Sequence, residues 1–426
     1  MNNFIKTLCC FFLFIGLNPS YAEYQTHKKD SLLVLKNGSI ITLTSESSSI
    51  KSGTIVIEDG KIKDINYKNP SQVYPNAKVI DLQGKYVLPG LIDSHVHLAT
   101  VPKEDRAENN AYVEAQLDRM IYAGITTVRD MAGNGIILAD YKRATQLNQV
   151  AGPEIFYSAQ FAGPGYFKEM RSYASRIESK VDSPWEQTIT DTTNIQLAIA
   201  RAKGAGITGI KIYNDLSPQL VARITKEAHA QGIKAWSHAA VFPASPYSIA
   251  EAKVNTMSHA WDIMYGLKDE YEITRNSLLD AIDYKQLDKL LLLMKKNNII
   301  LDATNFIAEN NSMTDGVKIT KRAHELGVKI SVGTDWPYIG MDGETELPLF
   351  EEIKLLINKC GFTNAQALYS ATKIGAEAID LTDRGVLEAG KRADILITDK
   401  NPLENIENIK THFMTIKSGI IYKNKI

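Results

Sequence analysis

From about residue 86 onward the chain alternates between short apolar runs and longer amphipathic stretches, a pattern typical of strands followed by helices. The predicted strands cover residues 86–97, 125–131, 154–161, 209–214, 233–239, 256–260, 299–305 and 329–335. Eight strand–helix units in succession predict an α/β fold of the (β/α)8 TIM-barrel type.

Signals at helix ends support this interpretation. We expect Ser217 to cap a helix over residues 218–230, which Gly232 then ends. Thr363 and Gln366 have the spacing of a capping box at the start of a later helix. The second half of the chain is therefore also expected to place helices between its strands.

The two ends of the chain show β patterns without helical stretches between them. In residues 23–85, Asn37-Gly38 and Asp59-Gly60 stand between apolar runs, and both dipeptides predict hairpins. The β pattern returns in residues 381–426. We expect these two segments to form one small β-sandwich domain, with the barrel of residues 86–380 inserted between them.

The first 22 residues differ from the rest. Lys6 precedes the apolar run of residues 8–17, and Ala22 ends a stretch with small residues where a signal peptidase would cut. We predict a secretory signal peptide over residues 1–22 that is cleaved after Ala22, and therefore a secreted or periplasmic protein. Cys9 and Cys10 leave lipoprotein processing open as an alternative.

Composition narrows the function classes. Of the 426 residues, 44% are hydrophobic and 23% are charged, as in ordinary soluble globular proteins. The formal net charge of −1 gives no reason to expect a nucleic-acid partner, and no apolar run approaches the ~20 residues of a membrane span. After Ala22 only Cys360 remains, so no intrachain disulfide can form. A homo-oligomer is compatible with the sequence, which does not fix the oligomeric state.

Two histidines, His95 and His97, end the first predicted barrel strand in the segment L-P-G-L-I-D-S-H-V-H. Residues i and i+2 of a strand point to the same face, so both imidazoles emerge on one side. Histidine is the commonest metal ligand among side chains. The pair predicts half of a metal site, although two surface histidines would give the same local pattern.

Further chemistry-bearing residues stand at the ends of later strands, where the catalytic groups of such barrels lie. They are Lys211 on the fourth strand, His238 on the fifth, His259 on the sixth and Asp335 on the eighth. Alternation in G-I-K-I-Y points Lys211 into the barrel, where a buried amine is costly unless it is paired or altered. A neutral amine can react with carbon dioxide, and the oxygens of the resulting carbamate can bridge two metals. Each residue alone has an ordinary structural explanation, but their coincidence at strand ends favours a shared site.

With these motifs, the sequence resembles the metal-dependent hydrolases of the amidohydrolase superfamily over nearly all of the chain after residue 22. Residues 88–97 resemble its first-strand signature, and G-I-T-T-V-R-D over 124–130 resembles its second strand. R-G-V-L-E-A-G-K-R-A-D-I-L-I-T-D over 384–399 resembles its return into the small sheet domain. The likeness is to imidazolonepropionase-like and Xaa-Pro-dipeptidase-like amidohydrolases.

The resemblance implies a centre with two metal ions. The matching ligands are His95, His97 and Asp335 for one ion, and His238 and His259 for the other. Carboxylated Lys211 and a hydroxide would bridge the ions, and two Zn²⁺ ions are the expected cofactor because this ligand set suits zinc. The hydroxide would attack a carbonyl while Asp335 takes its proton and passes it to the departing nitrogen.

Two positions depart from the dipeptidase-like pattern, which has a tyrosine two residues after the fifth-strand histidine and a G-G-H after the third strand. Here position 240 is Ala, and the third-strand segment F-A-G-P-G-Y-F over 161–167 has no histidine. Both departures count against a simple Xaa-Pro dipeptidase. Beneath the expected site, Arg129 and Asp130 are candidates for a structural ion pair.

Three functions remain open. The first is an exported amidohydrolase that uses two metal ions to cleave a carbon–nitrogen bond in a small, cyclic or linear, non-peptide amide. The second is a metallo-dipeptidase or carboxypeptidase, and the same chemistry would also allow a lactonase or phosphotriesterase. The third is a non-catalytic metal- or ligand-binding protein on the same scaffold, which would not need Asp335 as a proton shuttle.

Overall fold

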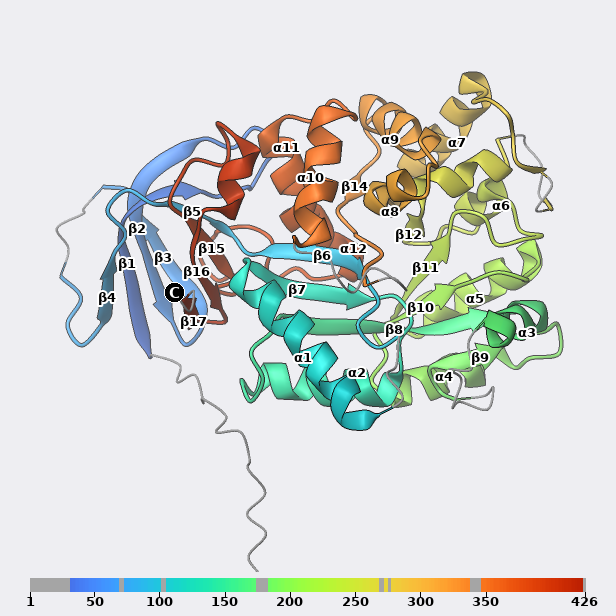
Figure 1. Cartoon of the computed structure of the whole chain (residues 1–426), viewed down its shortest axis with the longest axis horizontal. Coiled ribbons are helices and arrows are strands. Elements are labelled where there is room, and N and C mark those ends of the chain that lie inside the picture. Colours follow the sequence, from blue (N-terminus) through green and yellow to red (C-terminus); the bar gives the residue numbers. More distant parts are fainter. Residues whose placement is uncertain are drawn as a thin grey trace, which may run out of the picture.

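The structure, a computed structural model, describes residues 31–68, 73–100, 105–173, 183–267, 272–274, 277–337 and 346–423. The predicted signal peptide lies outside the described residues. Within them the chain forms a barrel of parallel strands with helices around it, and a mixed sheet stands at one end of the barrel (Figure 1). The predicted α/β barrel with a small β domain is confirmed.

Each predicted barrel strand is present, and its neighbours follow in chain order with parallel pairing. The strands are β6 (Leu91–Val96), β7 (Ile125–Asp130), β8 (Glu154–Ala162), β10 (Gly209–Ile212), β11 (Lys234–His238), β12 (Thr256–Ser258), β13 (Ile300–Asp302) and β14 (Ile330–Ser331). A further short strand, β9 (Glu186–Thr188), pairs with β8. The backbone N–H of Ser94 donates to the carbonyl of Val332 at 2.9 Å, which joins the first strand to the last.

Helices surround the barrel (Figure 1). They are α1 (Arg106–Tyr122), α2 (Gly135–Gln146), α3 (Pro164–Tyr173), α4 (Ile195–Gly204), α5 (Pro218–Ala230), α6 (Pro246–Glu251), η1 (Ala260–Tyr265), α7 (Tyr284–Lys296), α8 (Asn305–Asn310), α9 (Asp315–Glu325), α10 (Pro348–Asn358), α11 (Asn364–Tyr369), η3 (Ser370–Ile374) and α12 (Gly375–Ile379). The Ser217 hydroxyl caps α5, and Thr363 and Gln366 form the predicted capping box of α11. Among the described residues, no helix combines the length and apolar character needed to cross a membrane.

The two β-rich ends of the chain form one mixed sheet in the order β17-β16-β15-β5-β1-β2-β3, with β4 paired to β1. Its strands are β1 (Leu32–Ile41), β2 (Ile50–Glu58), β3 (Lys61–Asn66), β4 (Lys78–Asp81), β5 (Tyr86–Pro89), β15 (Ile395–Thr398), β16 (His412–Lys417) and β17 (Ile420–Lys423), with η4 (Ile406–Lys410) before β16. Buried residues from both ends, such as Leu33, Ile55, Ile395 and Ile416, pack into a core of their own.

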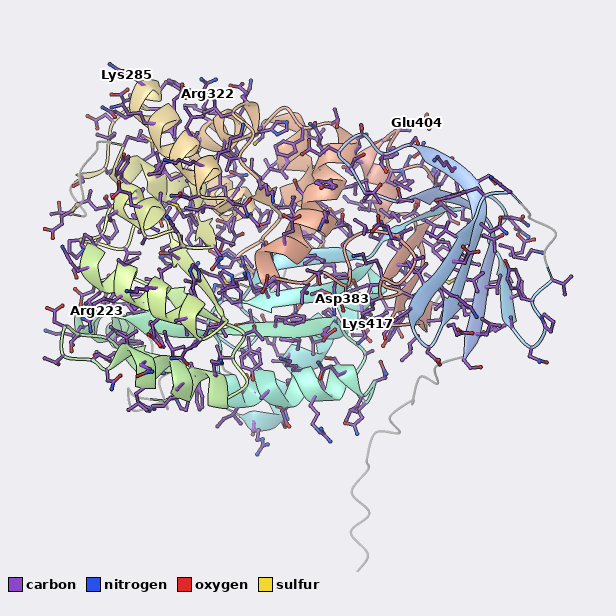
Figure 2. All side chains as sticks on the ribbon, turned by 180° about the vertical axis from the view of Figure 1, so that it is seen from behind. Arg223, Lys285, Arg322, Asp383, Glu404 and Lys417 are labelled. Carbon is purple, nitrogen blue, oxygen red and sulfur yellow. The ribbon has the colours of Figure 1, made fainter. Side chains whose placement is uncertain are left out.

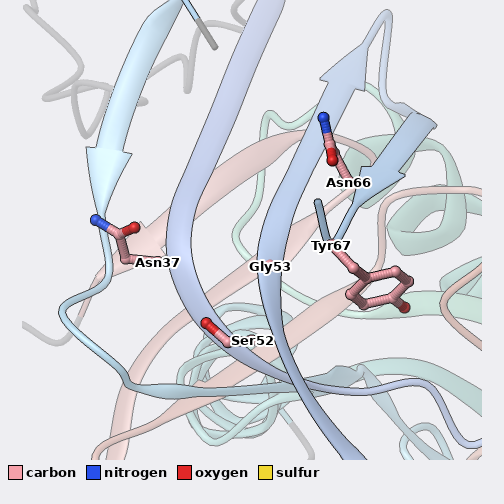
Figure 3. A pocket seen from close by; sticks show the side chains of 5 residues that line it. All are labelled: Asn37, Ser52, Gly53, Asn66 and Tyr67. Atoms are coloured by element: carbon pink, nitrogen blue, oxygen red, sulfur yellow. The ribbon is translucent and has the colours of Figure 1, made fainter. Parts of the chain in front are cut away.

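One of the two hairpin predictions is wrong. Asp59-Gly60 does turn the chain from β2 into β3, but Asn37-Gly38 lies inside β1 as a bulge, and β1 pairs with β2 on both sides of it. Asn37 still adopts the left-handed conformation that the dipeptide favours, with φ of 57°. The bulge separates the part of β1 that pairs with β4 from the part that pairs with β5. A small crevice beside it, lined by Asn37, Ser52, Gly53, Asn66 and Tyr67, contains none of the predicted site residues (Figure 3).

The predicted strand over residues 86–97 is in fact two strands that belong to different sheets. β5 pairs with β1 and β15 in the small sheet, and β6 begins the barrel. The chain changes sheets at Gly90, where an added Cβ would lie 2.4 Å from the Thr126 side chain. The small sheet therefore includes residues 86–89, just beyond the predicted domain limit at residue 85.

Buried charges hold the small sheet against the barrel. The ammonium of Lys417 on β16 donates to the backbone carbonyls of Thr145 at 2.8 Å and Gly152 at 2.6 Å. Arg384 reaches Glu154 at the start of β8 at 2.9 Å. Figure 2 shows Lys417 at this border. This border between the small sheet and the barrel, called the seam below, lies at the amino-terminal ends of the barrel strands. The carboxyl-terminal ends of the barrel strands therefore remain available for a site.

Candidate metal centre

The predicted ligands come together at the carboxyl-terminal ends of the barrel strands. His95 lies in β6, with His97 directly after it, and His238 ends β11. His259 follows β12, and Asp335 lies in the segment that continues β14. Residues more than 200 positions apart therefore meet at one end of the barrel, as the strand-end argument predicts.

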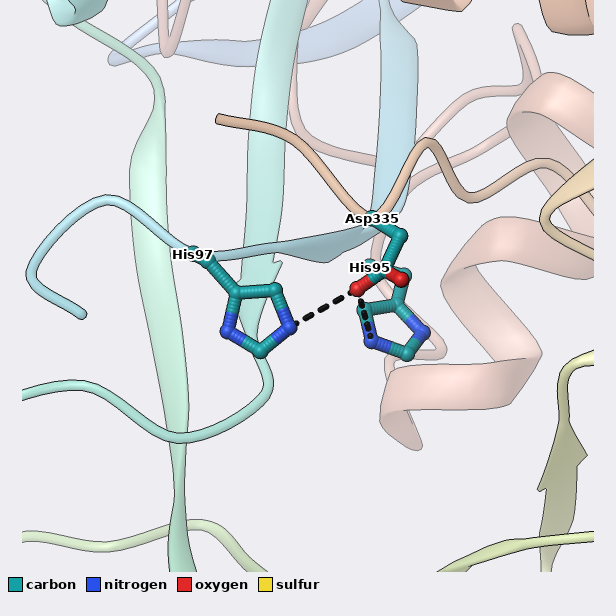
Figure 4. A group of neighbouring side chains, drawn as sticks. All are labelled: His95, His97 and Asp335. Carbon is teal, nitrogen blue, oxygen red and sulfur yellow. Dashed lines mark ion pairs between the residues drawn. The ribbon is translucent and has the colours of Figure 1, made fainter. Parts of the chain in front are cut away.

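Three of these residues form the tightest group. In Figure 4 the carboxylate of Asp335 lies between the rings of His95 and His97. Asp335 Oδ1 is 2.9 Å from His97 Nε2 and 3.2 Å from His95 Nε2. One ligand atom from each residue lies within 4.8 Å of the others, close enough for all three to hold one metal ion. A left-handed backbone at Asp335, with φ of 58°, aims its carboxylate at the histidines.

The other two histidines continue this group. The His259 ring lies 5.1 Å from the His95 ring and 4.7 Å from the His238 ring, measured between centroids. Burial lowers the pKa of His259 to about 3 and that of His238 well below its usual value. Both imidazoles are therefore neutral near pH 7, the form in which histidine binds a metal.

Lys211 points into the barrel, as the alternation of its strand predicts. Its side chain is fully buried, and Nζ donates to the hydroxyl of Ser258 at 2.6 Å. Burial lowers the pKa of the Lys211 amine to about 7, although Asp302 opposes this shift. A large share of the amine is thus neutral near pH 7, which is the reactive form for carbamate formation.

The donor set fits a divalent cation. His95 Nε2 is buried and has no hydrogen-bond partner among the described residues, even though Asp335 is near. A buried polar atom without a partner is costly unless something else satisfies it. Neutral imidazoles together with a carboxylate are the ligands of zinc and similar ions. These residues could therefore hold the metal that the sequence predicts.

The expected Arg129–Asp130 ion pair is wrong. The Arg129 guanidinium lies on Asp302, with Nη2 3.1 Å from Oδ2, and both side chains are fully buried. Asp130 instead accepts from the backbone N–H groups of Leu98 and Ala132. The sequence correctly predicted that Arg129 and Asp130 lie beneath the site. It could not show that Arg129 pairs with Asp302, which is distant in the chain.

Sequence reasoning also missed two side chains at the end of β13. Asp302 Oδ2 lies 2.7 Å from His95 Nδ1, and Thr304 Oγ1 lies 2.9 Å from His259 Nδ1. Both side chains could have been predicted, because they stand at the end of the predicted strand over residues 299–305.

A further carboxyl group, that of Asp262 in η1, was also missed. It is only 5% exposed, and its charge interacts with those of Lys211 and Asp335. Burial raises the pKa of Asp262 well above the usual range. The group is therefore a buried acidic neighbour of the site.

An aromatic row stands beside His238. The Tyr213 ring lies 4.5 Å from the His238 ring, and the Tyr166 ring lies 5.2 Å from that of Tyr213. Gln160 donates to the Tyr166 hydroxyl at 2.9 Å. Tyr166 belongs to the segment 161–167 that departs from the dipeptidase-like pattern.

Comparison with known proteins finds relatives over most of the chain. The model of the Amidohydrolase family matches residues 86–421. A 5'-deoxyadenosine deaminase of Methanosarcina acetivorans is 25% identical over 392 residues, covering 86% of this chain and 84% of the relative. An imidazolonepropionase of Brevibacillus brevis is 25% identical over 407 residues, covering 83% and 85%.

Solved structures show the same fold. A Xaa-Pro dipeptidase with methionine bound in its active site is 22% identical, with a TM-score of 0.75 over 92% of this chain and all of that chain. Molinate hydrolase is 19% identical, with a TM-score of 0.73 over 93% of this chain and 95% of that chain. At these identities the likeness extends to the architecture alone.

Proposed function

The chain belongs to the amidohydrolase family, and from this premise we propose that it is an exported, metal-dependent hydrolase. Its proposed reaction is cleavage of a carbon–nitrogen bond in a small, non-peptide or cyclic amide. Curated relatives support this class of reaction, because deamination is itself the breaking of a carbon–nitrogen bond.

The observation that carries the proposal is the convergence of His95, His97 and Asp335 on one point. Their ligand atoms lie within 4.8 Å of each other, and His95 Nε2 lacks a hydrogen-bond partner among the described residues. We assign one ion to these residues and a second to His238 and His259. Zinc is the proposed metal, and carboxylated Lys211 is the proposed bridge.

The residues of the site have the following roles in the proposed hydrolysis. When bound, two such ions lower the pKa of a water molecule and polarise a carbonyl. Asp335 accepts the proton of the attacking water and returns it to the departing nitrogen. The neighbouring histidines keep the pKa of Asp335 well below its usual value despite burial, so the carboxylate is in the ionised form, which can accept a proton.

Three alternatives remain. A dipeptidase is supported by the fold of the Xaa-Pro dipeptidase structure, but Ala240 and the segment 161–167 lack the side chains of that pattern. A lactonase would use the same groups on an ester. A non-catalytic binder on this scaffold would need the histidines but not the proton-accepting carboxylate of Asp335.

The remaining parts of the proposal concern processing and assembly. Export rests on the apolar run in residues 1–22, with cleavage proposed after Ala22. The proposed domain arrangement is residues 23–85, 86–380 and 381–426, with residues 86–89 moved to the small sheet. The proposed partner is a small amide-type substrate.

The test begins with the mature chain, screened against amides, dipeptides and lactones before and after removal of metal with a chelator. We expect an amide to be hydrolysed, activity to disappear with the metal, and Zn²⁺ to restore it. Elemental analysis would count the ions, and native mass spectrometry would detect the carbon dioxide added to Lys211.

The decisive variant is Asp335→Asn. Loss of its proton transfer should lower turnover by about 10²–10⁴-fold, while at least one ion remains bound. Asp315→Asn, at a partly exposed carboxylate that pairs with Lys318, is the control and should keep full turnover. Unchanged turnover in Asp335→Asn, or hydrolysis that persists without metal, would contradict the proposal.

A further inference from the structure

β13 carries none of the proposed metal ligands, yet its end lies against two of them. Asp302 Oδ2 is 2.7 Å from His95 Nδ1, and Thr304 Oγ1 is 2.9 Å from His259 Nδ1. Asp302 and Thr304 are both fully buried. One short stretch of chain therefore contacts a histidine from each of the two proposed ligand groups.

Asp302 is held so firmly that it can fix the ring beside it. The guanidinium of Arg129 and the hydroxyl of Ser258 donate to the same oxygen, at 3.1 Å and 3.0 Å. Arg129 in turn donates to the carbonyls of Ser94 at 2.5 Å and Ala378 at 3.1 Å. The carboxylate cannot turn away from His95 without breaking several buried hydrogen bonds.

Thr304 is fixed by a separate arrangement. It has a left-handed backbone, with φ of 49°, directly before α8. The N–H groups of Asn305 and Phe306, which begin that helix, donate to the buried carboxylate of Glu352 on α10 at 3.0 Å and 2.5 Å. This clamp holds the turn in the conformation that brings the Thr304 hydroxyl to His259.

These contacts determine which ring atom each histidine can offer. An ionised carboxylate can only accept a hydrogen bond, so His95 Nδ1 must carry a hydrogen and donate it to Asp302. His95 Nε2, the atom 3.2 Å from Asp335, is then left to bind a metal ion. At His259 the Thr304 hydroxyl occupies Nδ1, so Nε2 is the ring atom that would bind a metal ion.

We infer that residues 302–304, which end β13 and lead into α8, position the metal centre: Asp302 orients His95 and Thr304 orients His259. The inference rests on the proposed function, because it assumes that these histidines bind metal. It also links the two proposed ions, since one short stretch of chain holds a ligand of each. Asp302 extends this link through Ser258, which accepts from Lys211 at 2.6 Å.

Titration of the metal-free chain with Co²⁺, followed by visible absorption, tests Asp302. Loss of such a supporting group typically weakens metal binding by about 10–100-fold, and we expect Asp302→Asn to do so and to change the Co²⁺ spectrum. Asp394→Asn is the matched control, because Asp394 is also a buried carboxylate paired with an arginine, Arg392. It lies in the seam with the small sheet and should leave both affinity and spectrum unchanged.

Thr304→Val removes the hydroxyl and keeps the shape of the side chain, so it tests the second contact with little risk to folding. We expect weaker binding of one of two Co²⁺ equivalents, with recovery in Thr304→Ser. Thr372→Val, which removes a buried hydroxyl bonded to the backbone carbonyl of Leu368, is the control and should bind Co²⁺ as the wild type does.

The possible outcomes distinguish a failure of the proposed metal centre from a failure of the positioning inference. A wild-type chain that takes up no Co²⁺ would overturn the metal centre and this inference together. A wild type that binds Co²⁺ while Asp302→Asn and Thr304→Val keep its affinity and spectrum would overturn the inference alone. Equal losses in the variants and their controls would show general destabilisation, which also rejects a positioning role.

Discussion

Replacement of Arg129 with methionine should destabilise the barrel strongly. Arg129 is the buried counter-charge of Asp302, 3.1 Å away, and neither side chain is exposed. Despite burial, which lowers it, the pKa of Arg129 stays at about 10, and His95 and Arg129 hold the pKa of Asp302 at about 2. Both groups are therefore charged at pH 7, and Arg129→Met would leave the Asp302 carboxylate buried without its cation.

The size of the effect follows from what remains after the substitution. Breaking a buried ion pair by removing one partner costs about 3–5 kcal/mol. The carbonyls of Ser94 and Ala378 would also lose their donors, at about 1–3 kcal/mol each if they stay dry. Because the site can relax and admit water, these costs do not simply add. We expect a loss of about 4 kcal/mol in the free energy of unfolding.

Urea unfolding in the presence of a chelator would measure this loss without a contribution from bound metal. Tryptophan fluorescence is a suitable probe, because the Arg129 guanidinium lies 4.7 Å from the centre of the Trp236 ring. The double variant Arg129→Met/Asp302→Asn should lose less than the sum of the two single variants, by at least about 1 kcal/mol. The double variant removes both charges, so neither remains buried without its partner.

Two results would refute this reasoning. A loss below about 1 kcal/mol for Arg129→Met would mean that Asp302 is compensated without the guanidinium. Strictly additive losses in the double variant would mean that the two charges do not depend on each other. In either case packing, and not the attraction between the two charges, would account for the burial of Arg129 and Asp302.

Two further predictions concern the site and the seam. In Gly333→Ala the new Cβ would lie 2.2 Å from Asp302 Oδ1, so we expect weaker Co²⁺ binding in the titration described above; wild-type affinity would contradict this. Burial lowers the pKa of Lys417 to about 7 from 10.5, so the unfolded chain binds one more proton between these values and stability should rise with pH across that window. Urea unfolding at several pH values should show this rise in the wild type and a smaller rise in Lys417→Met. The control Lys423→Met, at an exposed lysine, should rise as the wild type does. An equal dependence of the free energy of unfolding on pH in all three proteins would refute the prediction.

Much of the barrel could be predicted from sequence because its signals are local. A strand end is visible as the point where an apolar run meets polar residues, and parallel strands bring their ends to one side. This logic placed His95, Lys211, His238 and Asp335 together without any knowledge of their distances. The caps of α5 and α11 are equally local, and both are present.

The errors arise where distant parts of the chain decide the outcome. Asn37-Gly38 has a hairpin signature, but β2 pairs with residues on both sides of it, and that pairing makes it a bulge. Arg129 has an acidic neighbour in sequence, Asp130, but in the fold it meets Asp302, 173 residues away. A local pattern states what conformation or charge is present, and only the packed structure selects its partner.

β13 illustrates why a strand without ligands can be as constrained as the strands that carry them. Its pairing with β12 sets Asp302 beside Ser258, and its pairing with β14 sets Asp302 beside Ser331. A shift of one residue in either register would turn the Asp302 side chain to the other face of the sheet and away from His95. Thr304, two residues further on, would move with it. The sheet hydrogen bonds of β13 thus set the orientation of both histidines, so its register is part of the proposed metal chemistry.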